Sequence, residues 1–340
     1  MTLSFEQIKE ITQGIEDIKS TFDGIQFFRF TEEELVVRKQ MGNGDRSYST
    51  AGVRMEFETD SKSLFIKFSV KSTMQRTYMA LDVLVNGQRI GSVRNSPEDE
   101  LLGTFFAINP YEWKDKIFEQ KFELGEGTKK VSLYLPWNHV TCLKELTVDD
   151  GCFVKPAPRS KRILVLGDSI THGFDAICPS RSYASVLTAR LDAQEYNKAI
   201  GGDKFFADIA ETLVERTYDY VSIAYGTNDW CLFDYETAKK NCEEFFEIVQ
   251  RKFKGSKFFV IGPVWRADYT DEMKFGKFEE MEKMIFEIAG KYENTHCIPG
   301  FELIDHDPAL YGDHKVHPND NGFKQYSERL WTEVEKYITK

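Results

Sequence analysis

Residues 162–173 read RILVLGDSITHG and decide the fold of the second half of the chain. The run RILVLG (162–167) is almost continuously apolar, which is typical of a parallel-sheet strand covered by helices on both faces. Two similar runs follow, YVSIAYG (220–226) and KFFVIGP (257–263). Together they predict the central strands of one parallel sheet.

Between these runs, apolar side chains recur every three to four residues, which predicts helices. Helices are expected at about 180–192, 205–217, 236–253, 272–291 and 320–338, and weaker strands near 195–200 and 295–298. Strand and helix therefore alternate, as in a three-layer α/β domain with a parallel sheet of about five strands.

The first half of the chain shows a different pattern of apolar residues. From Gly24 to about Lys155, short alternating or apolar runs are separated by turn residues, which predicts strands without intervening helices. These runs are GIQFFRF, ELVVRK, GVRMEFET, SLFIKFSV, ALDVLVNGQRIGSV, KIFEQKFEL and KKVSLYLPW. Asn86 and Gly87 both tolerate the positive φ of a type I′ hairpin turn. We expect an antiparallel, jelly-roll-like β-sandwich.

One amphipathic helix is expected over residues 4–19, ahead of the strands. Its apolar face would carry Phe5, Ile8, Ile11, Ile15 and Ile18. The proline-containing segment 155–159 separates the two halves. The predicted domains are therefore residues 1–155, a short helix plus β-sandwich, and residues 156–340, the α/β domain.

The composition argues against several partners. The net charge is -11 and no Lys/Arg-rich block is present, so nucleic acid and membrane surfaces are not expected to bind. The first residues, MTLSFEQIKEI, show neither a basic leader nor an apolar signal core, and the six cysteines form no C-x-x-C pair. These features predict a cytoplasmic protein with reduced thiols. They leave the oligomeric state open.

Small and polar residues follow the predicted strands. The segments are GDSITHG (167–173), NKAIGGD (197–203) and YGTND (225–229), and DHKVHPND (313–320) precedes the last helix. Ligands of open α/β sheets bind beyond the carboxyl ends of the strands. We therefore expect all four segments to meet at one crevice.

The residue types in these segments suit acyl chemistry. Ser169 follows a strand directly, and its hydroxyl becomes a nucleophile when a neighbouring base removes the proton. Three donors are available for an oxyanion: the Ser169 N–H, the Gly202 N–H and the Asn228 amide. His172 is too close to Ser169 on one helical turn to face both the serine and an orienting acid, so a structural role is favoured for it.

The four segments resemble the sequence blocks of SGNH/GDSL hydrolases, over about residues 160–338. The resemblance implies a flavodoxin-like SGNH hydrolase domain and a serine esterase that needs no cofactor. It places the nucleophile at Ser169, the general base at His317, and the oxyanion hole at Ser169, Gly202 and Asn228. In that family a glycine usually stands at the place of Ala199.

The first half resembles the β-sandwich found ahead of some SGNH esterases that deacetylate carbohydrates. This implies removal of a short acyl group, such as acetyl, from a carbohydrate or small-molecule ester. One alternative is a lipase or thioesterase on the same machinery. The other is a carbohydrate-binding protein with a vestigial hydrolase domain.

The orienting acid is less well defined. The family acid usually lies three residues before the base, and His314 holds that place. Asp313, four residues before His317, is the predicted acid, provided that the loop bulges at His314 and Lys315. Asp305, Asp307 and a backbone carbonyl are alternatives, and Asp320 is expected to cap the last helix.

Three further expectations concern the surroundings. The cluster of His306, His314 and His317 with nearby aspartates matches no metal-binding spacing, so no metal site is predicted. Trp230 and Trp265 follow strands and are predicted to stack on sugar rings, with packing in the core as the alternative. Asp168 and Asp229 are expected to brace turns.

Overall fold

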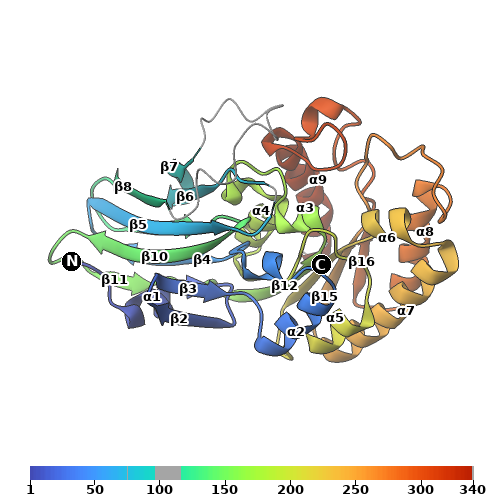
Figure 1. The fold of residues 1–340 in the computed structure, drawn as a ribbon, viewed down its shortest axis with the longest axis horizontal. Coiled ribbons are helices and arrows are strands. Elements are labelled where there is room, and N and C mark those ends of the chain that lie inside the picture. Colours follow the sequence, from blue (N-terminus) through green and yellow to red (C-terminus); the bar gives the residue numbers. More distant parts are fainter. Residues whose placement is uncertain (75, 96–115, 339–340) are drawn as a thin grey trace.

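The computed structural model describes residues 1–74, 76–95 and 116–338, which form a β domain and an α/β domain (Figure 1). Two antiparallel sheets make up the β domain. The first contains, in order, β2 (Asp17–Thr21), β3 (Gly24–Phe28), β10 (His139–Val148), β5 (Ser63–Ser72) and β8 (Ile117–Glu123). The second contains β1 (Thr12–Gln13), β4 (Arg54–Thr59), β9 (Lys129–Tyr134), β6 (Ala80–Val85) and β7 (Gln88–Arg94), with β11 (Val154–Pro156) beside β4.

The two sheets enclose one apolar core, in which Phe57, Ile66 and Leu133 are fully buried. The predicted hairpin joins β6 to β7, and both of its turn residues have positive φ, +49° at Asn86 and +81° at Gly87. The antiparallel β domain predicted from the alternating runs is thereby confirmed.

The first helix is shorter than expected. α1 spans Phe5–Ile11, and β1 and β2 follow within the range predicted as one helix, so that prediction is wrong beyond Ile11. Gly14 explains the break. Its φ is +81°, and a Cβ there would lie 2.6 Å from the carbonyl oxygen of Glu195 in the other domain.

A second difference concerns ELVVRK, which was predicted as a strand. It lies in α2 (Glu32–Gln40), whose start is fixed by Thr31. The Thr31 hydroxyl accepts from the Glu34 N–H at 3.2 Å, and the Glu34 carboxylate accepts from the Thr31 N–H at 2.7 Å. This reciprocal capping box outweighs the strand preference of Val36 and Val37.

The α/β domain contains five parallel strands. Their order is β13 (Ala193–Asn197), β12 (Lys161–Gly167), β14 (Tyr220–Ala224), β15 (Lys257–Ile261) and β16 (Thr295–Ile298). The order 2-1-3-4-5 is that of flavodoxin-like folds. The predicted fold class is therefore confirmed.

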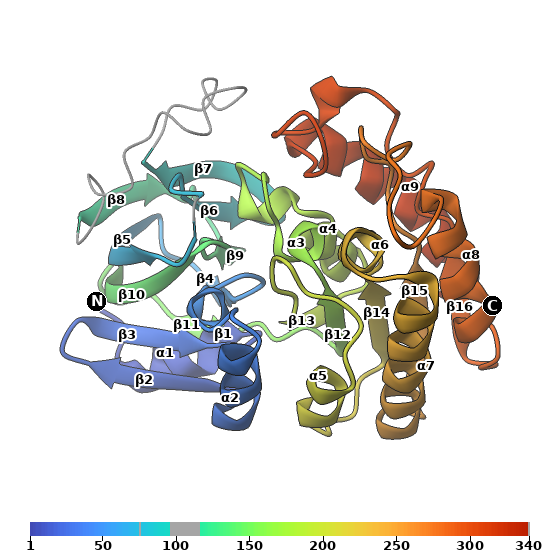
Figure 2. The same cartoon turned by 45° about the vertical axis from the view of Figure 1, so that its right-hand side comes forward.

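Helices cover both faces of this sheet (Figure 2). α4 (Tyr183–Arg190) and α9 (Asp320–Ile338) lie on one face, and α5 (Ala207–Thr212), α7 (Tyr235–Lys252) and α8 (Phe278–Ala289) lie on the other. β12 shows why its sequence is continuously apolar: Ile163 and Val165 pack toward the first group, and Leu164 and Leu166 toward the second. In the described part of the chain, every helix is too short or too polar to cross a membrane.

The short helices are α3 (Ser169–His172), α6 (Thr227–Leu232), η1 (Asp45–Tyr48), η2 (Pro179–Arg181) and η3 (Pro308–Leu310). β11 still belongs to the β domain and ends at Pro156, and β12 begins at Lys161. The boundary predicted between residues 155 and 156 thus falls inside β11.

A buried polar network joins the domains next to the 197–203 segment. α2 packs against α5, and Arg38 of α2 forms an ion pair with Asp203. Lys198 forms ion pairs with Glu34 at 2.8 Å and with Glu16 at 3.1 Å. All these groups lie away from water, so each charge needs its partner and the segment is held firmly.

Candidate active site

Ser169 is the first residue of α3, directly after β12. The Asp168 carboxylate accepts from the Ile170 N–H at 3.0 Å, and this bond caps the helix. The turn before it requires a glycine, because a Cβ at Gly167 would lie 2.8 Å from the carbonyl oxygen of Ala224. Ser169 is 6% exposed, so only a small part of its surface reaches solvent.

His317 reaches this hydroxyl from the loop before α9. Its Nε2 lies 2.8 Å from the Ser169 Oγ. The loop is held in place by the Gly312 N–H, which donates to the His317 carbonyl at 2.7 Å, and the imidazole packs on the Phe174 ring at 5.2 Å between centroids. Two residues far apart in the sequence are therefore in hydrogen-bond contact.

Asp313 lies on the far side of the imidazole, with its Oδ2 2.6 Å from Nδ1 of His317. Its Oδ1 accepts three backbone N–H groups, from Lys315 (3.0 Å), Val316 (2.8 Å) and His317 (3.1 Å). The loop can close this tightly because His314 adopts a left-handed conformation with φ +56°. Asp313 lies four residues before His317, one more than the usual family spacing, and the left-handed turn at His314 accommodates this extra residue.

The charge state of Asp313 follows from its partners. Burial alone would raise its pKa, but the hydrogen bond from His317, the charge of that imidazole when it is protonated, and the backbone donors hold the pKa of this carboxyl well below its usual range. Asp313 is therefore an anion and accepts the proton of Nδ1. Nε2 is then the acceptor that faces the Ser169 hydroxyl.

The other two candidate acids are turned away from His317. Asp305 forms an ion pair with Arg329 at 2.5 Å and accepts from Gln325 at 3.0 Å. Asp307 accepts from the Ala309 N–H at 2.9 Å and caps η3.

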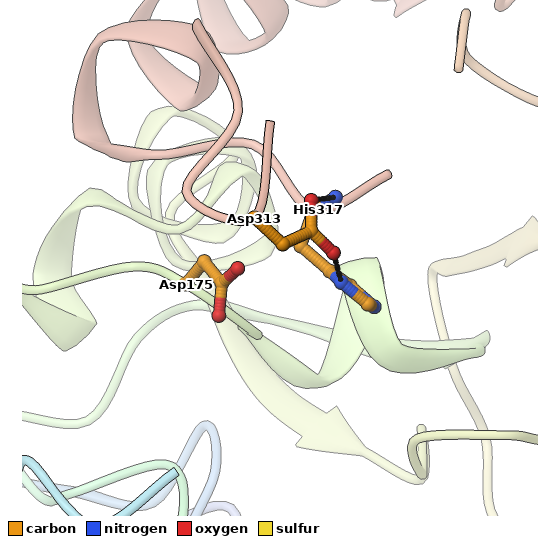
Figure 3. A group of neighbouring side chains, drawn as sticks. All are labelled: Asp175, Asp313 and His317. Atoms are coloured by element: carbon orange, nitrogen blue, oxygen red, sulfur yellow. Dashed lines mark hydrogen bonds and ion pairs between the residues drawn. The ribbon is translucent and has the colours of Figure 1, made fainter. Parts of the chain in front are cut away.

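A third carboxylate and an arginine complete this cluster. Figure 3 shows the Asp175 carboxylate beside the pair formed by Asp313 and His317. Arg76, from the β domain, donates through Nε to Asp175 at 3.0 Å, and its Nη2 lies 3.8 Å from Asp313 and 3.5 Å from Nδ1 of His317. The guanidinium thus links the β domain to the acid.

The same three residues are the ones that could share a metal ion. One donor atom from each of Asp175, Asp313 and His317 lies within 4.8 Å of the others. The Arg76 guanidinium already contacts all three and supplies the positive charge that a cation would bring. These residues therefore fit an arginine better than a metal.

The expected oxyanion donors come from two other strand ends. Gly202 has φ +93°, and none of the described residues accepts a hydrogen bond from its N–H. Asn228, in α6 after β14, is half-buried, and its Nδ2 donates to the Asp203 carbonyl at 2.9 Å. That bond uses one amide hydrogen and fixes the orientation of the second.

His172 supports the glycine loop. Its Nδ1 accepts from the Gly201 N–H at 3.2 Å, and its Nε2 contacts the Trp137 carbonyl at 3.0 Å and the Ser49 Oγ at 2.8 Å. Burial lowers the pKa of His172 well below its ordinary value, so the ring is neutral. It has a structural role, as expected.

Trp230 and Trp265 are both buried, so the prediction that they stack on sugar rings is wrong. Trp230 is 0% exposed, donates to the Gly276 carbonyl at 2.9 Å and packs edge-on against Phe278. Trp265 is 6% exposed and stacks on His306 with ring centroids 5.4 Å apart. Packing of the surrounding loops covers both rings.

The expectation that Asp320 caps the last helix is also wrong, because Asn319 caps α9 instead. The Asn319 side chain accepts from the N–H groups of Asn321 at 3.0 Å and Gly322 at 3.1 Å. Asp320 accepts from the Ile177 N–H at 2.8 Å and forms an ion pair with Arg181 at 2.9 Å.

Sequence reasoning missed three site residues, Asp175, Arg76 and Arg46. Arg76 and Arg46 both come from the β domain, and Arg46 in η1 donates to the Gly201 carbonyl at 2.5 Å. No motif surrounds either residue in the sequence. Only the packing of the two domains brings Arg46 to Gly201 and Arg76 to Asp175.

Comparison with known proteins identifies the family of the α/β domain. Residues 165–325 match the model of the GDSL-like lipase/acylhydrolase family. No curated protein matches the chain. The α/β half of this chain is therefore a GDSL-like lipase/acylhydrolase domain of the SGNH type.

Solved structures share the layout of both domains. The salicylyl-acyltransferase SsfX3 from a tetracycline biosynthetic pathway superposes with a TM-score of 0.79 at 19% identity, over 96% of this chain and 94% of that chain. A Bacteroides ovatus protein described as a GDSL-like lipase gives 0.73 at 18% identity, over 100% and 98%. A family two carbohydrate esterase from Cellvibrio japonicus gives 0.65 at 15% identity, over 100% and 98%. At these identities the likeness establishes a common fold.

Proposed function

We propose that this protein is a serine ester hydrolase that works through an acyl-enzyme. The observation that carries the proposal is the hydrogen-bonded series Ser169, His317 and Asp313, with distances of 2.8 Å and 2.6 Å. A hydroxyl, a neutral imidazole and a fixed carboxylate in this order are the parts that acyl transfer to serine requires.

The proposed steps follow from this order. His317 Nε2 takes the Ser169 proton while Oγ bonds to the ester carbonyl carbon. The resulting oxyanion faces the N–H groups of Ser169 and Gly202 and the Asn228 amide. The C–O bond to the alcohol then breaks, and His317 returns the proton to the alcohol. Water, deprotonated by His317, attacks the acyl-enzyme and releases the carboxylic acid and Ser169.

For the substrate, we propose a short acyl group, such as acetyl, on a carbohydrate or small molecule. The two-domain layout supports this, because it is shared with family two carbohydrate esterases and with an acetyl xylan esterase from Butyrivibrio proteoclasticus. The latter superposes with a TM-score of 0.61 at 12% identity.

The test is a panel of p-nitrophenyl esters from acetyl to octanoyl, followed by acetylated sugars, with the parent and Ser169→Ala. We expect turnover that falls as the chain lengthens and that Ser169→Ala abolishes while Tm stays unchanged. Stoichiometric labelling of the parent by a fluorophosphonate would separate an active serine enzyme from a mere binding protein. Faster turnover of octanoyl than of acetyl esters would favour a lipase or thioesterase.

A second candidate is acyl transfer to an alcohol other than water. It is favoured by the TM-score of 0.79 with an acyltransferase. The chemistry is the same up to the acyl-enzyme, and only the acceptor differs. Formation of a new ester when alcohols are added to the assay, at the expense of free acid, would distinguish transfer from hydrolysis.

A further inference from the structure

Arg46 lies beside the glycine loop that carries one of the expected oxyanion donors. Its Nη1 donates to the Gly201 carbonyl at 2.5 Å, and a Cβ placed on Gly202 would lie 3.5 Å from the same nitrogen. The guanidinium therefore borders the place where the ester carbonyl would sit.

The position of Arg46 is well defined. Within and beside η1, the Ser47 hydroxyl donates to the Asn43 carbonyl at 3.1 Å, and the Ser49 hydroxyl donates to the Arg46 carbonyl at 2.8 Å. The Ser49 Oγ also contacts His172, which holds Gly201 from the other side. Arg46 and the glycine loop are thus parts of one connected structure.

This guanidinium has no carboxylate partner within the described ranges of the chain. Among the described residues, no ion pair within 4.0 Å includes Arg46, and its bond to the Gly201 carbonyl uses one of five N–H donors. The closest acidic candidate, Asp203, is buried and is taken up by Arg38 and by the Asn43 amide at 3.2 Å. The negative charge of Asp203 is therefore already balanced by Arg38.

A second cation flanks the same loop. Lys204 donates through Nζ to the Gly202 carbonyl at 3.3 Å and lies 5.0 Å from the centroid of the Phe206 ring. It too forms no ion pair with any residue in the described part of the chain. Two cations without carboxylate partners thus border Gly202 in a chain whose net charge is -11.

A third cation, Arg76, lies over the ring of Phe174. Its guanidinium lies 5.3 Å from the centroid of the Phe174 ring, and that ring also blocks the space beside Gly201. The charge of Arg76 is shared with Asp175 at 3.0 Å and Asp313 at 3.8 Å. Arg46 and Lys204 are consequently the cations available to a ligand.

From this arrangement we infer that the site takes acetyl esters of an anionic alcohol, such as an acidic sugar, whose carboxylate binds Arg46 with support from Lys204. The inference rests on the proposed esterase function. An acetyl group has no room for a charge, so the alcohol half of the ester carries it. An arginine that is fixed in place and only partly hydrated suits recognition of a carboxylate.

The test compares esters of equal shape that differ in charge: 3- and 4-acetoxybenzoate against 3- and 4-acetoxybenzamide. In the parent, kcat/KM for the better benzoate should exceed that of its benzamide by about tenfold or more, after correction for uncatalysed hydrolysis, because a charged hydrogen bond is gained. Arg46→Gln should lower this ratio about tenfold and Arg46→Lys much less. Added salt should lower the ratio in the parent.

Arg251→Gln is the matched control, since Arg251 lies on the exposed face of α7 and pairs with Glu211. Its ratio should equal that of the parent. A ratio that Arg46→Gln leaves unchanged would overturn the inference and reduce Arg46 to a support of the Gly201 carbonyl.

A binding experiment tests this inference separately from the proposed function. In Ser169→Ala, calorimetry with the acetoxybenzoates should show binding about tenfold tighter than with the benzamides, and adding Arg46→Gln should remove the difference. If the parent hydrolyses no ester but this difference is seen, the esterase proposal fails and the anion site stands. Equal binding of both compounds would overturn the anion site even in an active esterase.

Discussion

The carboxylate of Asp313 contacts His317 in two ways, accepting from its backbone N–H at 3.1 Å and from its Nδ1 at 2.6 Å. One side chain therefore sets both the course of the loop and the orientation of the ring. Because Arg76 also approaches this carboxylate, the β domain takes part in holding the acid.

Asp313→Asn should lower kcat by ~10²–10⁴, because an amide can stabilise the wrong tautomer of His317 and cannot balance its positive charge. Steady-state kinetics with p-nitrophenyl acetate measures this. Asp305→Asn is the control, as Asp305 is exposed and pairs with Arg329, and its kcat should stay within about twofold of the parent. Equal activity of Asp313→Asn and the parent would show that His317 works as a dyad with Ser169.

Asn228→Ala should lower kcat by ~10²–10³ with little change in KM, since the donor acts mainly on the oxyanion. The loss of the bond to the Asp203 carbonyl also loosens the loop, so Tm should be measured alongside. A change confined to KM would assign Asn228 to substrate binding instead.

Incubation with EDTA should leave esterase activity unchanged. The reason is that the Arg76 guanidinium contacts the three residues that could share a metal, Asp175, Asp313 and His317. The measurement is activity after chelation and dialysis, with Zn²⁺ and Mn²⁺ added back. Loss of activity that one of these ions restores would contradict the expectation.

Asp229 should make stability depend on pH. Burial raises its pKa to about 7, and its Oδ2 has no hydrogen-bond partner in the described structure. Between pH 4 and 7 the folded state keeps a proton that the unfolded state has lost. Stability therefore falls as pH rises through this window, by up to ~1.4 kcal/mol for each pH unit from this group.

Asp229→Asn should flatten that part of the profile, because an amide does not titrate and can still accept from the Phe205 N–H. Urea unfolding of the parent and the variant at several pH values tests this. Asp168, whose pKa burial also raises to about 7, remains in both proteins, so a slope in this pH window persists in the variant. Identical profiles would contradict the role given to Asp229.

In the second half of the chain, local sequence patterns predict the fold. The runs at 162–167, 220–226 and 257–263 are apolar on both faces, and such strands need helices on each side. Ser169 follows β12 and Asn228 follows β14, and these neighbouring parallel strands end at the same edge of the sheet, as the sequence predicts. The hairpin at Asn86 followed from turn chemistry in the same way.

Other features were decided by contacts between distant segments. The sequence alone does not decide whether Asp313, Asp305 or Asp307 orients His317. In the structure, the left-handed turn at His314 brings Asp313 to the imidazole. The tryptophans after two strands could face water or the core, and loop packing buried them. Their surroundings, not their local sequence, fix their exposure.

The contribution of the β domain is the clearest case. Arg46 and Arg76 lie 123 and 93 residues before Ser169, without a motif around them. Only the docking of the two domains places them beside Gly201 and Asp175. A local pattern encodes which backbone hydrogen bonds and which buried face a segment can have. It does not encode which charged side chain of another domain will meet it, because that is set by the packing of whole surfaces against each other.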